Sequence, residues 1–149
     1  MRRGAILAIA VAVSVAAGAC APAAPAHEGD DEALTCEAGF STPPGFHATE
    51  SLEDPYADHV GIRLGFADDD GRELHYFAGI PGEFGEGLPP AGTVAAGIGV
   101  GAVLQGSETT WVLSWRTPGP CGVRAVLGSG FGKEEFIGTL ERAGIVPAQ

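Results

Sequence analysis

Basic residues are scarce in this chain, which has 8 Lys and Arg against 19 Asp and Glu and a formal net charge of −11. Without Arg2 and Arg3 the charge is −13. Phosphate binding needs a basic face, so nucleic acid is not an expected partner. An anionic membrane surface would not attract the protein either, so membrane contact would depend on an attached lipid.

Long apolar runs are also absent. The uncharged, mostly apolar run Ala5–Ala17 has 13 residues, whereas a bilayer core of about 30 Å needs roughly 20. Arg2 and Arg3 precede this run, and the small residues Gly18 and Ala19 follow it. A positive start, a short apolar run and small residues are the three parts of a signal peptide. The sequence therefore predicts export, with a signal peptide over residues 1–19.

The stretch Ala17-Gly18-Ala19-Cys20 resembles the lipobox of bacterial lipoproteins, in which the cysteine is acylated and becomes the mature N-terminus. The resemblance implies that Cys20 carries lipid and anchors the protein on the outer face of the cell membrane. Ala17 departs from the pattern, which favours a larger aliphatic residue there. The alternative is cleavage by an ordinary signal peptidase, which would release a secreted protein with a thiol at Cys20.

Cysteine is rare as well, and three cysteines in an exported protein leave one unpaired. If Cys20 is acylated, Cys36 and Cys121 remain as one pair, and an oxidising compartment lets a disulfide persist. The bond would close a loop of 86 residues. Two buried free thiols are the alternative. Neither cysteine has a nearby Cys or His at ligand spacing, so we expect no metal site there.

The chain divides by composition into three parts. Residues 20–35, after the signal peptide, are rich in Ala, Pro and acidic side chains and have no apolar period, which predicts a lipid-anchored linker. Residues 36–149 have a normal size for one domain. We therefore expect a single α+β domain over this range.

Alternating apolar residues over 60–66 and 74–80 predict a β-hairpin around Asp68-Asp69-Asp70-Gly71-Arg72. The predicted register places Phe66 opposite Leu74, Leu64 opposite Tyr76, and Ile62 opposite Ala78. A second hairpin is predicted from one long strand over 94–104, with a turn at Gly106-Ser107. Its register pairs Ala102 with Trp111, Val100 with Leu113, and Ile98 with Trp115.

A fifth strand is predicted over 121–127, contributing Val123, Ala125 and Leu127, and a helix over 133–143. A short helix is also expected over 49–57. Together these elements predict a curved antiparallel sheet of about five strands, with the C-terminal helix packed on its apolar face.

The opening Pro43-Pro44-Gly45-Phe46, the Gly-rich strand before a Trp-containing strand and the final short helix form a pattern over most of residues 40–146. It resembles the extracytoplasmic domain of some bacterial anti-sigma factors and related lipoproteins, in which a curved sheet wraps a helix in a half-barrel. The resemblance implies a sensing or ligand-holding domain without catalysis.

Gly97, Gly99 and Gly101 would form a bare stripe on one face of the long strand. Glycine in a strand costs about 0.5–1 kcal/mol relative to Ala, so the stripe needs a reason. Sheet curvature or close backbone approach is one. A groove for a ligand or a partner strand is the other, which makes these three residues the candidate binding groove.

Other motifs do not indicate chemistry. The loop over 68–72 lacks the spaced ligands of a calcium site, and His59 and His75 would lie about 20 Å apart along one hairpin. Residues 128–133 lack the glycine and Ser or Thr positions of a phosphate loop, and Ser129 lacks a nucleophile elbow. We expect no catalytic residues, cofactor or metal.

These observations predict a lipid-anchored extracytoplasmic binding or sensing domain, whose partner is a small ligand or an envelope protein. Two alternatives stay open. One is a small extracytoplasmic hydrolase, and the other is a structural or protein-interaction module of the cell envelope.

Overall fold

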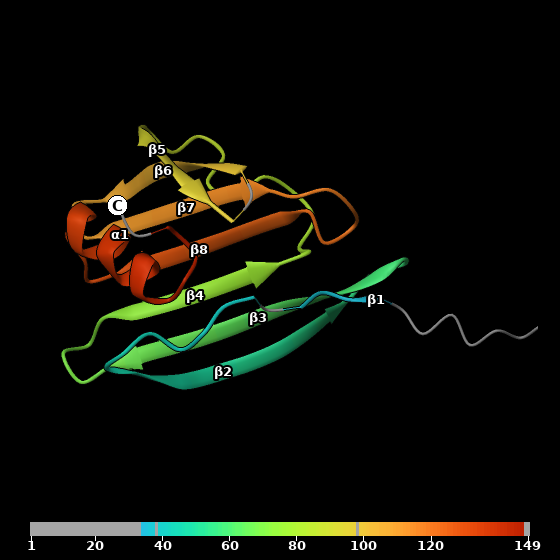
Figure 1. Ribbon diagram of the computed structural model, residues 1–149, viewed down its shortest axis with the longest axis horizontal. Coiled ribbons are helices and arrows are strands. Elements are labelled where there is room, and N and C mark those ends of the chain that lie inside the picture. The colour runs from blue at the N-terminus through green and yellow to red at the C-terminus, as the bar shows by residue number, and fades with distance from the viewer. Residues whose placement is uncertain (1–33, 38, 98, 148–149) are drawn as a thin grey trace, which may run out of the picture. The chain divides into compact units, whose positions relative to one another are not determined.

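The computed structural model describes residues 34–37, 39–97 and 99–147, which belong to one compact unit, Glu32–Gln149. The predicted signal peptide and Cys20 lie outside the described residues. The elements are β1 (Leu34–Thr35), β2 (Phe46–Pro55), β3 (His59–Asp68), β4 (Glu73–Ala78), β5 (Pro90–Ala96), β6 (Gly99–Ser107), β7 (Thr110–Arg116), β8 (Val123–Ser129) and α1 (Lys133–Arg142) (Figure 1).

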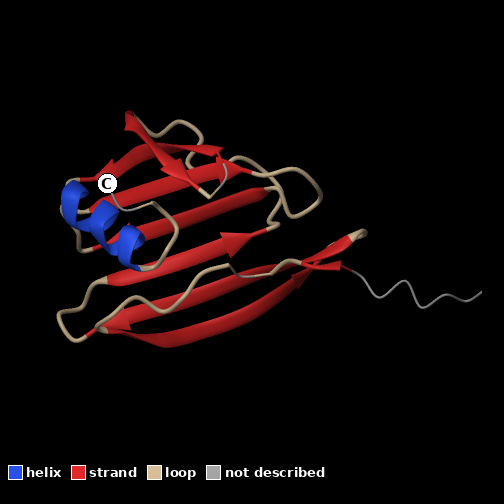
Figure 2. Ribbon diagram, in the orientation of Figure 1, coloured by secondary structure: helices blue, strands red, loops and turns tan. Residues whose placement is uncertain are grey.

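The strands form one open sheet in the order β1-β3-β4-β8-β7-β6-β5, and β2 pairs with β3 along its outer edge. All neighbours are antiparallel except β1 and β3, which run parallel. The α+β class is confirmed as a sheet with one C-terminal helix (Figure 2). The expected count of about five strands is wrong, because the sheet has eight. β1 and β2 were not predicted, and the long strand over 94–104 is two strands.

The short helix expected over 49–57 is also wrong, because this segment forms most of β2. Its backbone pairs with β3 from Phe46 opposite Asp68 to Pro55 opposite Val60, with a bulge between Ala48 and Glu50. Pro55 favours an extended conformation at the residue before it. Most β2 side chains are exposed, so pairing with the free edge of β3, rather than an apolar period, decides its conformation.

The first hairpin has the predicted register, with Phe66 opposite Leu74, Leu64 opposite Tyr76 and Ile62 opposite Ala78. The Asp68 carboxylate stabilises the turn by accepting hydrogen bonds from the backbone N–H groups of Asp70 (3.0 Å) and Arg72 (2.9 Å). Gly71 has φ +81°, which favours glycine. The Arg72 guanidinium also contacts Glu135 of α1 and so connects the turn to the helix.

The second hairpin differs from the prediction. The chain turns at Gly97, where φ is +55°, and β6 then pairs Ala102 with Ser114, Val103 with Leu113 and Gln105 with Trp111. The predicted pairs of Ala102 with Trp111 and Val100 with Leu113 are therefore wrong, and Ile98 lies outside the described residues.

The shift has a local cause at the turn. Ser107 Oγ accepts a hydrogen bond from the Thr109 N–H (3.3 Å), and Ser107 pairs with Thr110, so the turn lies at 108–109 rather than 106–107. A bulge between Gln105 and Ser107 completes the change. The displacement by an odd number of residues reverses the faces of β6, and Val100 is 71% exposed.

The core lies on one face of the sheet, called here the inner face, which carries the buried side chains of Leu74, Tyr76, Leu113 and Val126. Helix α1 has its predicted position and packs on this face through Phe136. A Cβ on Gly128 would lie 2.5 Å from the Phe136 ring, so glycine allows the close approach. No helix in the described ranges is long and apolar enough to cross a membrane.

The segment 36–45, between β1 and β2, covers another part of the inner face. The Phe40 ring lies 5.1 Å from the rings of both Phe66 and Tyr76. The C-terminal residues after α1 reach the β5–β6 turn, where the Gly97 N–H donates to the Ile145 carbonyl (3.1 Å). These two segments and the sheet surround the end of the inner face that α1 leaves open.

Candidate functional site

The predicted disulfide between Cys36 and Cys121 is formed, with the two Cα atoms 5.4 Å apart. Cys36 follows β1, where its N–H donates to the Val60 carbonyl (2.8 Å), and Cys121 lies in the turn before β8. The bond therefore joins the N-terminal segment 36–45 to the turn before β8, the strand that neighbours β4. Gly79 passes directly beside Cys36 Sγ, and its φ of +69° and lack of a Cβ are both required there.

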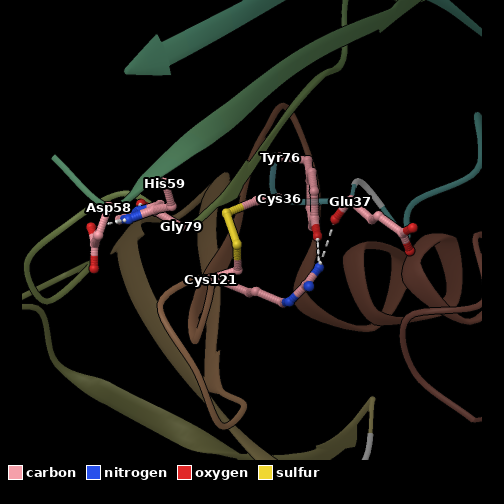
Figure 3. The surroundings of a disulfide bond; sticks show 8 residues. Cys36, Glu37, Asp58, His59, Tyr76, Gly79 and Cys121 are labelled. Atoms are coloured by element: carbon pink, nitrogen blue, oxygen red, sulfur yellow. Dashed lines mark hydrogen bonds and ion pairs between the residues drawn. A yellow bond between two sulfur atoms is a disulfide. The ribbon is translucent and has the colours of Figure 1, made fainter. Parts of the chain in front are cut away.

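Two groups of polar residues flank this disulfide (Figure 3). On one side, His59 Nδ1 lies 2.7 Å from Asp58 Oδ1 and His59 Nε2 lies 2.6 Å from the Gly79 carbonyl oxygen. Both neighbours accept hydrogen bonds, so the arrangement favours the doubly protonated imidazolium. The bond to Gly79 and then that to Asp58 raise the pKa of His59, and the bond to His59 lowers the pKa of Asp58. This group stabilises the corner at Gly79.

On the other side of the disulfide lies a cavity of about 270 Å³ on the inner face. Its floor is the sheet, and its walls are the N-terminal segment, the β5–β6 turn and the residues that follow α1. It is lined by Gly39, Tyr76, Gly97, Trp115, Thr117, Arg124, Gly144 and Ile145.

Arg124 and Tyr76 supply the polar centre of the cavity. Arg124 Nη1 donates to Tyr76 Oη at 2.6 Å and to the Glu37 carbonyl at 3.1 Å. The Tyr76 side chain is fully buried, and this burial raises the pKa of its hydroxyl in spite of the nearby guanidinium. Tyr76 therefore stays protonated at neutral pH beside a positive charge.

Trp115 adds an indole N–H to the same cavity. Its ring lies 6.4 Å from that of Tyr76, and its Nε1 would be 3.4 Å from a Cβ on Gly97. The Trp111 N–H donates to the Phe131 carbonyl at 3.0 Å, whereas no acceptor for the Trp115 N–H is found among residues 34–37, 39–97 and 99–147. The two tryptophans of the chain therefore differ in a measurable way.

A second hollow, of about 360 Å³, lies on the outer face under the loop between β4 and β5. Phe84 of this loop packs on Phe77, with ring centroids 4.5 Å apart. The two charged residues that line the hollow, Arg116 and Glu83, form an ion pair with each other at 3.5 Å. Because these charges are already matched, the inner-face cavity is the stronger candidate.

The three glycines of the predicted groove do not lie on one strand. Gly97 is in the β5–β6 turn and lines the cavity, whereas Gly99 and Gly101 are in β6. Gly101 is buried, and a Cβ there would lie 2.6 Å from Leu113 Cδ1, so close packing explains it. The continuous stripe is therefore wrong as a structural prediction, and only Gly97 belongs to the candidate site.

The cavity residues Tyr76, Trp115 and Arg124 were not singled out from the sequence as functional residues. Val123, Ala125 and Leu127 were expected to point toward the core from the last strand, but Arg124 and Val126 share the face of Tyr76 and Ala78. The signal in the sequence for this site was Arg124, a basic residue within a mostly apolar strand. Comparison with protein-family models, curated proteins and solved structures finds no match to this chain.

Proposed function

We propose that the protein is a lipid-anchored extracytoplasmic domain that binds a small ligand in the inner-face cavity, without catalysis. The observation that carries the binding function is the convergence of Tyr76, Trp115 and Arg124 on a cavity with a largely apolar lining. A concave apolar site with a few placed polar groups is the usual form of a ligand site. The polar groups at its centre are hydrogen-bond donors, which hold a ligand without supplying a nucleophile or general base.

Export and anchoring are supported by the signal-like N-terminus and by Cys20. The formed disulfide agrees with an oxidising compartment. The resemblance to anti-sigma-factor domains, with their curved half-barrel, supports sensing across the envelope as the role of this binding.

The anchor is tested by the variant Cys20→Ala in the native host. We expect it to leave the membrane fraction and to appear in the soluble exported fraction, because no acylated cysteine remains. The matched control is Cys121→Ala, which removes another cysteine but leaves Cys20 in place and should stay in the membrane fraction. Equal membrane association of the wild type and Cys20→Ala would contradict the anchor.

Binding is tested separately with a fragment set that contains neutral, cationic and anionic molecules. The readout is the pair of indole ¹H–¹⁵N cross-peaks of the ¹⁵N-labelled protein. Ligands in the cavity should move the Trp115 peak and leave that of Trp111, which is bonded to Phe131, in place. If no fragment of any charge moves the Trp115 peak, the binding function is wrong.

A further inference from the structure

We propose that the ligand of the inner-face cavity is a small carboxylate with an apolar body. This inference rests on the proposed binding function and names its ligand class. The geometry that carries it is a set of donors, from Tyr76, Trp115 and Arg124, around one small space.

The Tyr76 hydroxyl has a hydrogen that it can donate to a ligand. The hydroxyl oxygen accepts from Arg124 Nη1 at 2.6 Å, which leaves the hydroxyl hydrogen to be donated. Within the described part of the chain no acceptor for that hydrogen is found, although the side chain is fully buried. Buried polar groups in proteins are nearly always hydrogen-bonded, and this hydroxyl meets the rule as an acceptor, while its capacity to donate is unused. A ligand that accepts this hydrogen bond would use it.

The indole N–H of Trp115 is a second donor at the cavity. A Trp N–H can only donate, and this one has no acceptor among the described residues. Two donors without an acceptor, from Tyr76 and Trp115, therefore line the same cavity as the Arg124 guanidinium. The opposite arrangement, an excess of acceptors, would have indicated a cation or an amine.

A carboxylate is the type of ligand group that matches these donors. An ionised carboxylate only accepts hydrogen bonds, and its two oxygens can receive several at once. Its charge also suits a guanidinium, which pairs well with carboxylates. An alcohol or primary amide would add donors of its own to a donor-rich space. A carboxylate therefore fits the polar centre better than a neutral group of the same size.

The size and the lining of the cavity indicate the rest of the ligand. The cavity of about 270 Å³ is several times larger than the ~30 Å³ that one water occupies in the liquid. Besides the donors, it is lined by Thr117, Ile145, the Trp115 ring and three glycines, and most of the lining is apolar. Inorganic phosphate would fill only part of this space and would leave the apolar surface wet. The fit is therefore to a carboxylate with a compact hydrocarbon or aromatic body.

The experiment uses benzoate as the probe and benzamide as its uncharged counterpart of the same shape. Each is titrated into the ¹⁵N-labelled full chain carrying Cys20→Ala, with the Trp115 indole peak as the readout and that of Trp111 as the internal reference. We expect saturable movement of the Trp115 peak with benzoate. Benzamide should bind at least about tenfold more weakly, because a charge-assisted hydrogen bond is lost. Inorganic phosphate should leave the peak in place.

Two variants assign the effect to the cavity. Tyr76→Phe keeps the buried ring and removes the donor, and Arg124→Gln removes the charge; each should weaken benzoate binding by about tenfold. The matched control is Arg116→Gln, which removes the same charge from the outer face and should leave benzoate binding unchanged. The comparison of benzoate with benzamide on the unaltered cavity needs no variant, so a misfolded variant cannot decide the outcome.

Three results would overturn the carboxylate: equal binding of benzoate and benzamide, phosphate binding as tightly as benzoate, or Arg116→Gln weakening benzoate as much as Arg124→Gln. If benzoate does not bind while neutral or cationic fragments still move the Trp115 peak, the ligand class is wrong and the binding function stands. If no fragment moves it, both are wrong.

Discussion

Breaking the Cys36–Cys121 disulfide should lower the stability of the domain substantially. The two cysteines are 85 residues apart in the sequence, and the chain-entropy model assigns about 4–5 kcal/mol to a closed loop of that length. With an unfolding entropy of roughly 2.1 cal/mol/K per residue, a loss of this size lowers the Tm of a 114-residue domain by about 15–20 °C.

The structure adds a local consequence to this global one. Cys36 precedes Glu37, whose carbonyl accepts from Arg124, and Gly39, which lines the cavity. Without the disulfide, this wall is held to the sheet chiefly by the Cys36 N–H bond to Val60 and by Phe40 packing. Reduction should therefore weaken benzoate binding below the new Tm, while the folded sheet persists.

The assay is calorimetric unfolding of the oxidised protein, the protein reduced with a phosphine, and the double variant Cys36→Ala/Cys121→Ala. A thiol count before each scan shows that reduction is complete, and Cys20→Ala in all samples removes the third cysteine. Equal Tm values with and without the disulfide, within about 3 °C, would refute the loop-closure reasoning.

Two further predictions follow from single positions. Gly101→Ala should destabilise the fold by about 1–3 kcal/mol, because its Cβ would lie 2.6 Å from Leu113 Cδ1, whereas Gly99→Ala meets nothing closer than 3.8 Å and should be tolerated; urea unfolding of the pair checks this, and equal losses would contradict the packing. His59 has a raised pKa, first through its bond to the Gly79 carbonyl. Its contribution to stability should therefore be fully present below about pH 6.5 and decline as pH rises through the raised pKa. The urea midpoint of unfolding, measured from pH 6 upward, should depend less on pH in His59→Gln than in the wild type. The same pH dependence in both proteins would contradict this role.

Local chemistry made part of the fold predictable. The Asp-rich turn with Gly71 fixes the first hairpin, because its capping bonds and positive φ involve only neighbouring residues. The helix over 133–142 likewise follows from its own apolar stripe and the glycine that ends it. The disulfide pairing follows from counting, since only Cys36 and Cys121 remain once Cys20 is assigned to lipid.

The second hairpin could not be predicted in the same way. The alternation of apolar residues runs unbroken from 94 to 104, so it does not mark the reversal at Gly97. A single bulge near Gly106 then shifts the register by an odd number and exchanges the two faces of β6. The stripe of Gly97, Gly99 and Gly101 required one continuous strand, and the turn at Gly97 divides that strand.

The sequence by itself determined the first hairpin, the C-terminal helix and the partner of each domain cysteine, because each depends on neighbours in the chain or on a count. Tertiary structure alone decided the edge strand β2, which needs the free backbone of β3. It also decided the cavity, since Tyr76, Trp115 and Arg124 come from β4, β7 and β8 and meet only through cross-strand pairing. No periodicity within one segment records which donors will face each other across three strands.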